Sequence, residues 1–211
     1  MPIINPQETY TYRKYFDLRI APIDLCQYFG YGLIRTQIQP VGELINTESV
    51  KQDILEISPQ LLSPNEQAKR EMFVAPVVKL VVKVTHALIR IEYPINVSPQ
   101  LQGEVDYILS VENLQELLII AAKRDDIDYG FTQLIAQMIG VDQWDSAPSI
   151  ELQPVLLGAV TTGVFWQFAQ LDRRTKQVTQ GLNSFRSPED LDEVVRMLVH
   201  ALKGGQTAQS S

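Results

Sequence analysis

The stretch GEVDYILSVENLQELLIIAAKRDDIDYGFTQLIAQMIG, residues 103–140, carries the clearest secondary-structure pattern in the chain. Residues 103–110 alternate in side-chain character, which is typical of a β-strand. Residues 116–122 form an almost continuous apolar run, which favours a second strand buried on both faces. The first strand should present two sets of side chains in opposite directions: Val105, Tyr107 and Leu109 on one face, and Glu104, Asp106 and Ile108 on the other.

A helix is predicted directly after these two strands, over residues 127–139. Apolar side chains recur there at the spacing of one helix face, at Ile127, Phe131, Leu134, Ile135 and Met138. Gly140 should end the helix, because glycine is the common residue just past a helix C-terminus. The apolar stripe is the only large apolar surface of this helix, so we expect it to pack onto the sheet.

Upstream, the sequence SPNE at residues 63–66 predicts a helix start, with Ser63 as the N-cap and Glu66 completing a capping box. This helix should run toward Val84, with Pro76 bending it or splitting it in two. Residues 87–95, rich in isoleucine and leucine, then predict a strand.

Downstream, residues 155–160 and 164–171 predict paired strands around the turn TTG at 161–163, followed by a short strand over 177–182. The sequence SPED at 187–190 should cap a last helix, which ends at Gly204. Its inward face would be formed by Leu191, Val194, Val195, Leu198 and Leu202. The order of helix, three strands, helix and further strands predicts an α/β fold with a mixed sheet flanked by helices.

Residues 1–62 are rich in aromatic side chains but have no sustained period. A short helix over 24–29 and an extended piece over 33–41 are expected. Burial is the usual fate of aromatic side chains, and stacking of nucleic-acid bases on them is the alternative. We expect an N-terminal extension, 1–62, packed on a core of residues 63–204, with a disordered tail over 205–211.

The formal charge of −7 argues against a domain that grips DNA tightly by itself, because phosphate neutralisation supplies most non-specific affinity. DNA is therefore expected to bind weakly, and a protein partner or a homodimer is also compatible with the chain. The single cysteine excludes an intrachain disulfide and favours the cytoplasm. The longest apolar stretch, residues 73–84, contains a proline and two lysines, so no membrane span is expected.

Candidate chemistry centres on Asp106 in the first strand of the quoted stretch and on Lys123, which lies 17 positions later at the end of the second. Hydrolysis of a phosphodiester requires carboxylates that hold a divalent cation, and a cationic or polar group near the attacked phosphate. Oxygen ligands of this kind suit Mg²⁺. The two histidines have no metal-ligand spacing, which makes a zinc site improbable.

These motifs resemble the PD-(D/E)XK restriction-endonuclease-like family, most closely the N-terminal nuclease domain of type I restriction enzyme R subunits. The resemblance covers about residues 63–182 and rests on GEVDYIL at 103–109, AAKR at 121–124, GFTQL at 130–134, and GAVTTGVFWQF at 158–168. It implies a restriction-endonuclease-like fold and magnesium-dependent cleavage of DNA. Asp106 and Glu66 would bind the metal, Lys123 would stabilise charge at the phosphate, and Gln133 would orient water or the backbone.

The chain departs from this family at Ala121, where the Glu-x-Lys signature carries its second acid. Three explanations are open: Glu66 or Glu104 replaces the acid, the metal binds weakly through Asp106 and Glu66, or the site has decayed. These explanations lead to two functions. The first is a magnesium-dependent DNA endonuclease, and the second is a catalytically inactive member of the fold that binds protein or nucleic acid.

Overall fold

The structure is a computed structural model that describes residues 4–111, 115–121 and 127–204, with the backbone alone for 115–121. In chain order, its helices and strands are α1 (Tyr12–Asp17), α2 (Pro22–Tyr28), β1 (Gly32–Thr36), α3 (Glu48–Ile57), η1 (Ser58–Gln60), α4 (Glu66–Lys69), η2 (Arg70–Val74), α5 (Ala75–Thr85), β2 (Leu88–Pro94), β3 (Glu104–Val111), β4 (Gln115–Ala121), α6 (Ile127–Asp142), β5 (Val155–Thr161), β6 (Phe165–Asp172), β7 (Gln177–Gly181), β8 (Phe185–Arg186) and α7 (Leu191–Leu202).

The strands form one mixed sheet in the order β1-β7-β6-β5-β4-β3-β2, and β8 pairs with β6. Strands β2, β3 and β4 make an antiparallel meander. The chain then crosses through α6 to β5, which runs parallel to β4. This connection follows the usual physical requirement, because parallel neighbours need a long crossover that is commonly a helix. The expected α/β architecture with a mixed sheet and flanking helices is therefore confirmed.

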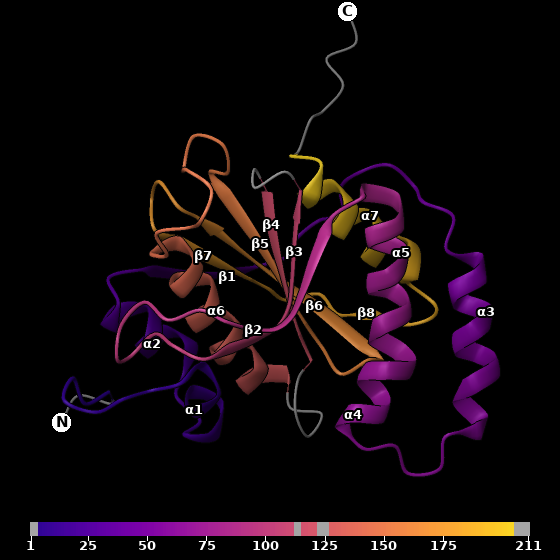
Figure 1. Cartoon of the computed structure of the whole chain (residues 1–211), viewed down its shortest axis with the longest axis horizontal. Helices are drawn as coiled ribbons and strands as arrows, with labels where there is room; N and C mark the ends of the chain where they lie inside the picture. The colour runs from indigo at the N-terminus through magenta and orange to yellow at the C-terminus, as the bar shows by residue number, and fades with distance from the viewer. Residues whose placement is uncertain (1–3, 112–114, 122–126, 205–211) are drawn as a thin grey trace, which may run out of the picture.

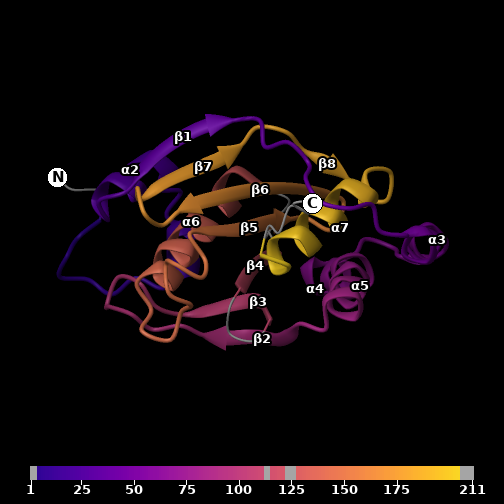
Figure 2. The same cartoon turned by 90° about the horizontal axis from the view of Figure 1, so that it is seen from above.

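Helices cover both faces of the sheet (Figure 1). Helix α6 lies on one face with α1 and α2 packed against it, and α7 lies on the other face with α5 beside it and α3 outermost. Each face has its own cluster of buried apolar side chains. Figure 2 shows β1 and β2 at the two opposite edges of the sheet.

Helix α6 packs as its apolar periodicity predicts. The side chains of Phe131, Leu134, Ile135 and Met138 are fully buried. Two of them press on the sheet at Gly158 of β5, where a Cβ would lie 2.7 Å from Leu134 Cδ1 and 2.9 Å from Met138 Sδ. A glycine in β5 thus allows the helix to approach the sheet closely.

The predicted helix end at Gly140 is wrong, because α6 continues to Asp142. Gly140 serves packing instead. A Cβ at this position would lie 2.3 Å from Tyr12 Oη and 3.0 Å from Tyr12 Cζ, so only glycine leaves room for the Tyr12 ring. That ring is held in place because Tyr12 Oη donates a hydrogen bond of 3.0 Å to the Ile95 carbonyl.

The helix predicted from residue 63 begins two residues later than expected. Asn65 is the N-cap, and its side chain accepts a hydrogen bond from the Ala68 amide. Ser63 lies outside the helix with a φ of 49°. The expected disruption at Pro76 is confirmed: the π-helical turn η2 separates α4 from α5, and Pro76 lies in the first turn of α5. Proline lacks an amide hydrogen, so it is tolerated at a helix start but not within one.

The strict alternation predicted for 103–110 fails at its beginning. Tyr107 and Leu109 belong to the buried cluster on the α5 and α7 side, but Val105 belongs to the cluster on the α6 side together with Ile108. Strand β2, which pairs with β3, turns at the same level, where Glu92 has a φ of 49°. Both strands therefore change their orientation between the Val105 pair and the Tyr107 pair.

Residues 4–62 contribute directly to the sheet and to the core. Strand β1 pairs in parallel with β7 at one edge of the sheet. Burial of the aromatic side chains is the observed outcome for five of them: Tyr10, Tyr12, Tyr15, Phe16 and Tyr31. Helix α3 had no clear signal in the sequence. In the described ranges, no helix is both long and apolar enough to cross a membrane. The predicted disordered tail, 205–211, lies outside the described residues.

Candidate functional site

The candidate site lies near the end of β4. This is where the sequence has Ala121 in place of the acid of the Glu-x-Lys signature. Ala121 is the last residue of β4 and pairs with Thr161, the last residue of β5. The following turn presses on the helical segment before α5: a Cβ at Gly163 would lie 3.1 Å from Phe73 Cβ and 3.5 Å from the Lys69 carbonyl oxygen. The ends of β4 and β5 and the helical segment α4–η2 therefore meet at one edge of the fold.

Asp106 lies in β3, the middle strand of the meander, and its side chain is half-buried. The flanking register pairs are Tyr107 with Ile91 and Val105 with Tyr93. Glu92 of β2 therefore lies at the same level as Asp106, at the point where the strands turn. Both carboxylates act on the charge of Arg70, so the two acids lie in one environment.

Arg70 bridges from the helical segment to this pair of acids. Its Nη1 donates a hydrogen bond of 3.0 Å to Glu92 Oε1. Burial by itself lowers the pKa of Arg70, because it disfavours the charged guanidinium. The hydrogen bond with Glu92 and the nearby Tyr107, Glu92 and Asp106 have the opposite and larger combined effect, so the pKa of Arg70 is raised. Arg70 thus stays cationic at any ordinary pH and serves as a counter-charge for the two carboxylates.

Tyr107 adds a hydroxyl to the same environment. Burial is the main cause that raises the pKa of Tyr107, and the carboxylates of Glu71, Asp106 and Glu92 raise it further, while Arg70 lowers it. The phenol is therefore neutral at physiological pH and can donate a hydrogen bond. Asp106, Glu92, Arg70 and Tyr107 together form the Arg70 cluster.

The Arg70 cluster has the donor chemistry for a hard divalent cation and for a phosphate. Mg²⁺ takes only one or two protein carboxylates and fills the rest of its shell with water and substrate oxygens. Asp106 and Glu92 meet that minimum, although Arg70 already engages Glu92. Within residues 4–111 and 127–204, no three His, Cys, Asp or Glu side chains gather as a metal-binding group.

The other predicted site residues come from several parts of the chain. Lys123 lies outside the described residues. Glu66 is exposed at the first position of α4, one helical turn before Arg70. Glu104, the other proposed replacement acid, is exposed at the start of β3. Gln133 is buried within α6. Whether Asp106 and Lys123 share one face, as the signature requires, stays a prediction.

Two residues near the predicted site had no clear signal in the sequence. Glu92 comes to the level of Asp106 only through the pairing of β2 with β3, which no local pattern specifies. Gln137 is fully buried on α6, and its Nε2 donates a hydrogen bond of 3.0 Å to the Glu104 carbonyl, which fixes α6 to the start of β3. The helical spacing from Gln133 to Gln137 puts both amides on one side of α6.

Comparison with known proteins found no family model that matches the chain and no curated protein that matches its sequence.

Proposed function

We propose that this chain is a PD-(D/E)XK-like protein that acts on DNA phosphodiesters with a weakened, magnesium-dependent site. The observation that supports it most is the placement of Asp106. It lies on the middle strand of an antiparallel β2-β3-β4 meander, which is preceded by a helix and followed by α6 and the parallel strand β5. This is the element order that the sequence resemblance implies, with the acid on the second strand.

In this proposal Glu92, rather than Glu66, partners Asp106. Glu92 lies between the register pairs that flank Asp106, and both carboxylates act on Arg70, whereas Glu66 is a solvent-exposed side chain at a helix start. Glu92 would thus compensate for the acid that Ala121 lacks. The compensation is incomplete, since Arg70 competes with any cation for the Glu92 carboxylate.

Each group in the cluster has a chemical role in the proposed reaction. Asp106 and Glu92 would hold a magnesium ion. That ion would supply Lewis acidity and a more acidic water. Arg70 can turn from Glu92 to the non-bridging phosphate oxygens, because its planar fork matches phosphate geometry. Lys123 would add positive charge at the phosphate, as the resemblance implies, and Gln133 would orient water or the backbone.

A second candidate is a catalytically inactive member of the same fold that binds a protein or nucleic acid. Ala121 favours it, because the position that carries an acid in the signature has a methyl group instead. The Arg70–Glu92 ion pair favours it as well, because an internal cation stabilises the acidic pair without metal.

Calorimetric titration with Mn²⁺ and nicking of supercoiled plasmid distinguish the two candidates. The purified wild type should bind Mn²⁺ weakly and nick DNA slowly. Asp106→Asn and Glu92→Gln should each reduce Mn²⁺ affinity by more than about tenfold, because a charged ligand contributes more than the groups that merely orient ligands. Glu66→Gln should have little effect, and Asp53→Asn, an exposed acid on α3, is the matched control.

Ala121→Glu provides the complementary gain-of-function test. A carboxylate restored at the end of β4 should raise Mn²⁺ affinity and increase nicking. If neither the wild type nor Ala121→Glu binds Mn²⁺, the metal-dependent nuclease is excluded and the inactive binding protein is favoured. If the wild type nicks rapidly and Asp106→Asn does so equally, the site lies elsewhere.

A further inference from the structure

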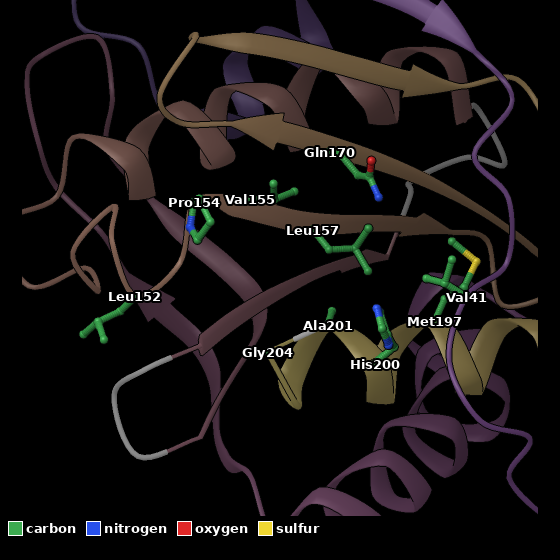
Figure 3. A pocket seen from close by; sticks show the side chains of 10 residues that line it. All are labelled: Val41, Leu152, Pro154, Val155, Leu157, Gln170, Met197, His200, Ala201 and Gly204. Carbon is green, nitrogen blue, oxygen red and sulfur yellow. The ribbon is translucent and has the colours of Figure 1, made fainter. Parts of the chain in front are cut away.

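A hollow lies at the other end of the sheet, between α7 and strands β5 and β6 (Figure 3). Its volume is about 390 Å³. Leu157 and Val155 line it, four and six residues before Thr161 in the same strand, so the hollow lies about 13–20 Å from the end of β5, where the α4–η2 segment packs. It is therefore separate from the Arg70 cluster, and a ligand in this hollow is independent of the proposed function.

Most of the lining is apolar. Leu157 and Pro154 come from the β5 side, and Met197 and Ala201 come from α7. Leu152 and Val155 remain 51% and 46% exposed. Large apolar side chains that stay exposed around a concave site are typical of a ligand pocket rather than of a packed core.

Two polar side chains enter this apolar pocket from opposite walls. Gln170 of β6 lies beside Leu157, its register partner on β5. His200 of α7 points toward the strands from the other side, as Figure 3 shows. An amide and an imidazole each offer hydrogen-bonding atoms to a ligand. Each of the two side chains can therefore bind a polar group of a ligand in the pocket.

No Lys, Arg, Asp or Glu is among the described residues that line the pocket. A charged ligand would therefore lose its hydration without gaining an opposite charge, which is costly in an apolar site. A neutral ligand avoids this cost. The lining thus selects for an uncharged molecule with one hydrogen-bonding group.

A further wall of the pocket is formed by the segment that contains Val41 and Gly42, whose backbone lies close against α7. Val41 reaches the pocket from the segment between β1 and α3. Next to it, Gly42 has a φ of 100°, and a Cβ there would lie 2.7 Å from the Arg196 carbonyl oxygen and 2.8 Å from His200 Cβ. Only glycine permits this contact, so the contact fixes the segment against α7.

We propose that this pocket binds a small neutral molecule with an apolar body of about two rings and one hydroxyl or amide group, which hydrogen-bonds to Gln170 or His200. The size follows from the volume, because a cavity of roughly 150 Å³ accommodates one benzene ring. A pocket of about 390 Å³ has room for two such rings and a polar substituent.

The test uses 2-naphthol as the probe and 2-naphthalenesulfonate as its charged analogue, with the purified full chain at pH 7 and probe fluorescence as the readout. 2-Naphthol should bind saturably at one site, and the sulfonate should bind at least about tenfold more weakly. Ala201→Phe should fill the pocket and reduce 2-naphthol affinity at least about tenfold. Ala68→Phe, on α4 and away from the pocket, should leave the affinity unchanged.

The polar contacts are tested with the double variant Gln170→Leu/His200→Leu. It should bind 2-naphthol about tenfold more weakly and retain its affinity for naphthalene, since only the hydrogen-bonding groups are lost. Amide resonances in the wild type give an independent readout that does not depend on how the variants fold. Addition of 2-naphthol should shift the amide NMR resonances of Leu157, Gly158 and Gln170.

Four results would overturn the proposal. The first is an absence of saturable 2-naphthol binding to the wild type. The second is undiminished binding by a folded Ala201→Phe. The third is a set of resonance shifts that spares Leu157 and Gln170. The fourth is equal affinity for the sulfonate, which would show that the pocket does not select neutral molecules.

Discussion

Arg70 Nη1 lies 3.0 Å from Glu92 Oε1, so a guanidinium from the helical segment before α5 binds the carboxylate of β2 that lies in one environment with Asp106 of β3. The pair is asymmetric in exposure, with side chains 21% exposed for Arg70 and 53% exposed for Glu92. A cation that binds Glu92 must therefore compete with a partly buried positive charge.

Replacement of Arg70 should separate metal binding from DNA binding. Arg70→Gln removes the positive charge that competes with the metal and should raise Mn²⁺ affinity roughly tenfold. The reason is that the Arg70 guanidinium and a bound Mn²⁺ would lie a few ångströms apart and repel each other. If the proposed function holds, the same variant should weaken DNA binding, because the proposed contact of Arg70 with a phosphate is lost. Calorimetry with Mn²⁺ and a fluorescence anisotropy titration with duplex DNA measure the two effects. A fall in Mn²⁺ affinity would mean that Arg70 supports the metal site.

Gly140→Ala should destabilise the fold, although alanine is the better helix former by about 1 kcal/mol. The new Cβ would clash with the Tyr12 ring, and overpacking of this kind costs about 1–3 kcal/mol. In a Tyr12→Phe background the closest atom is gone, so the cost of Gly140→Ala should fall by about 1 kcal/mol. Urea denaturation of the wild type, the two single variants and the double variant measures the coupling free energy between the two positions. Strictly additive free energies of unfolding would contradict the clash with Tyr12.

Asp142→Asn should be among the most destabilising conservative changes. Asp142 and Arg173 form an ion pair of 2.7 Å, and both side chains are only 5% exposed. Tyr31 Oη also donates to Asp142 Oδ2 at 2.6 Å. Removal of one partner from a buried pair leaves an uncompensated charge, which costs about 3–5 kcal/mol.

Asp17→Asn is the matched control for this buried pair. Asp17 lies 3.9 Å from Arg13 across an exposed helix surface, with side chains 56% and 64% exposed. Such a pair contributes less than about 0.5 kcal/mol. Thermal unfolding should therefore distinguish the two substitutions clearly, and equal effects would show that burial does not set the strength of the Asp142 contact.

Asp192 should make stability depend on acid pH. Hydrogen bonds from Lys51 and Thr47 lower the pKa of the Asp192 carboxyl in the folded chain. Its contribution is therefore fully present above the unfolded pKa of about 3.9 and is lost as the pH falls through the lower folded value. Because the side chain is 38% exposed, solvent limits the contribution to less than about 1 kcal/mol. The stability gap between wild type and Asp192→Asn should close below pH 3, and a constant gap from pH 7 to pH 3 would contradict this linkage.

Local sequence periodicity determined the elements that bury a continuous apolar face. Helix α6, strands β5 and β6, and the disruption at Pro76 lie where the pattern predicts, because side chains at helical or alternating spacing must reach one face of their element. The burial of most N-terminal aromatic side chains also follows from their chemistry. Asp106 was found as a candidate because it lies within such a pattern.

The tertiary structure alone decided how these elements meet. Glycine signals a helix end or a close contact equally well, so only the Tyr12 ring shows why Gly140 lies inside α6. Val105 points away from its expected face because the strands turn between the Ile91–Tyr107 pair and the Tyr93–Val105 pair, where Glu92 has a positive φ. Glu92 and Asp106 are 14 positions apart in the chain, and their juxtaposition depends on the register of two strands. Register is set by the packing of whole faces and by turn geometry, and no single segment of sequence encodes it.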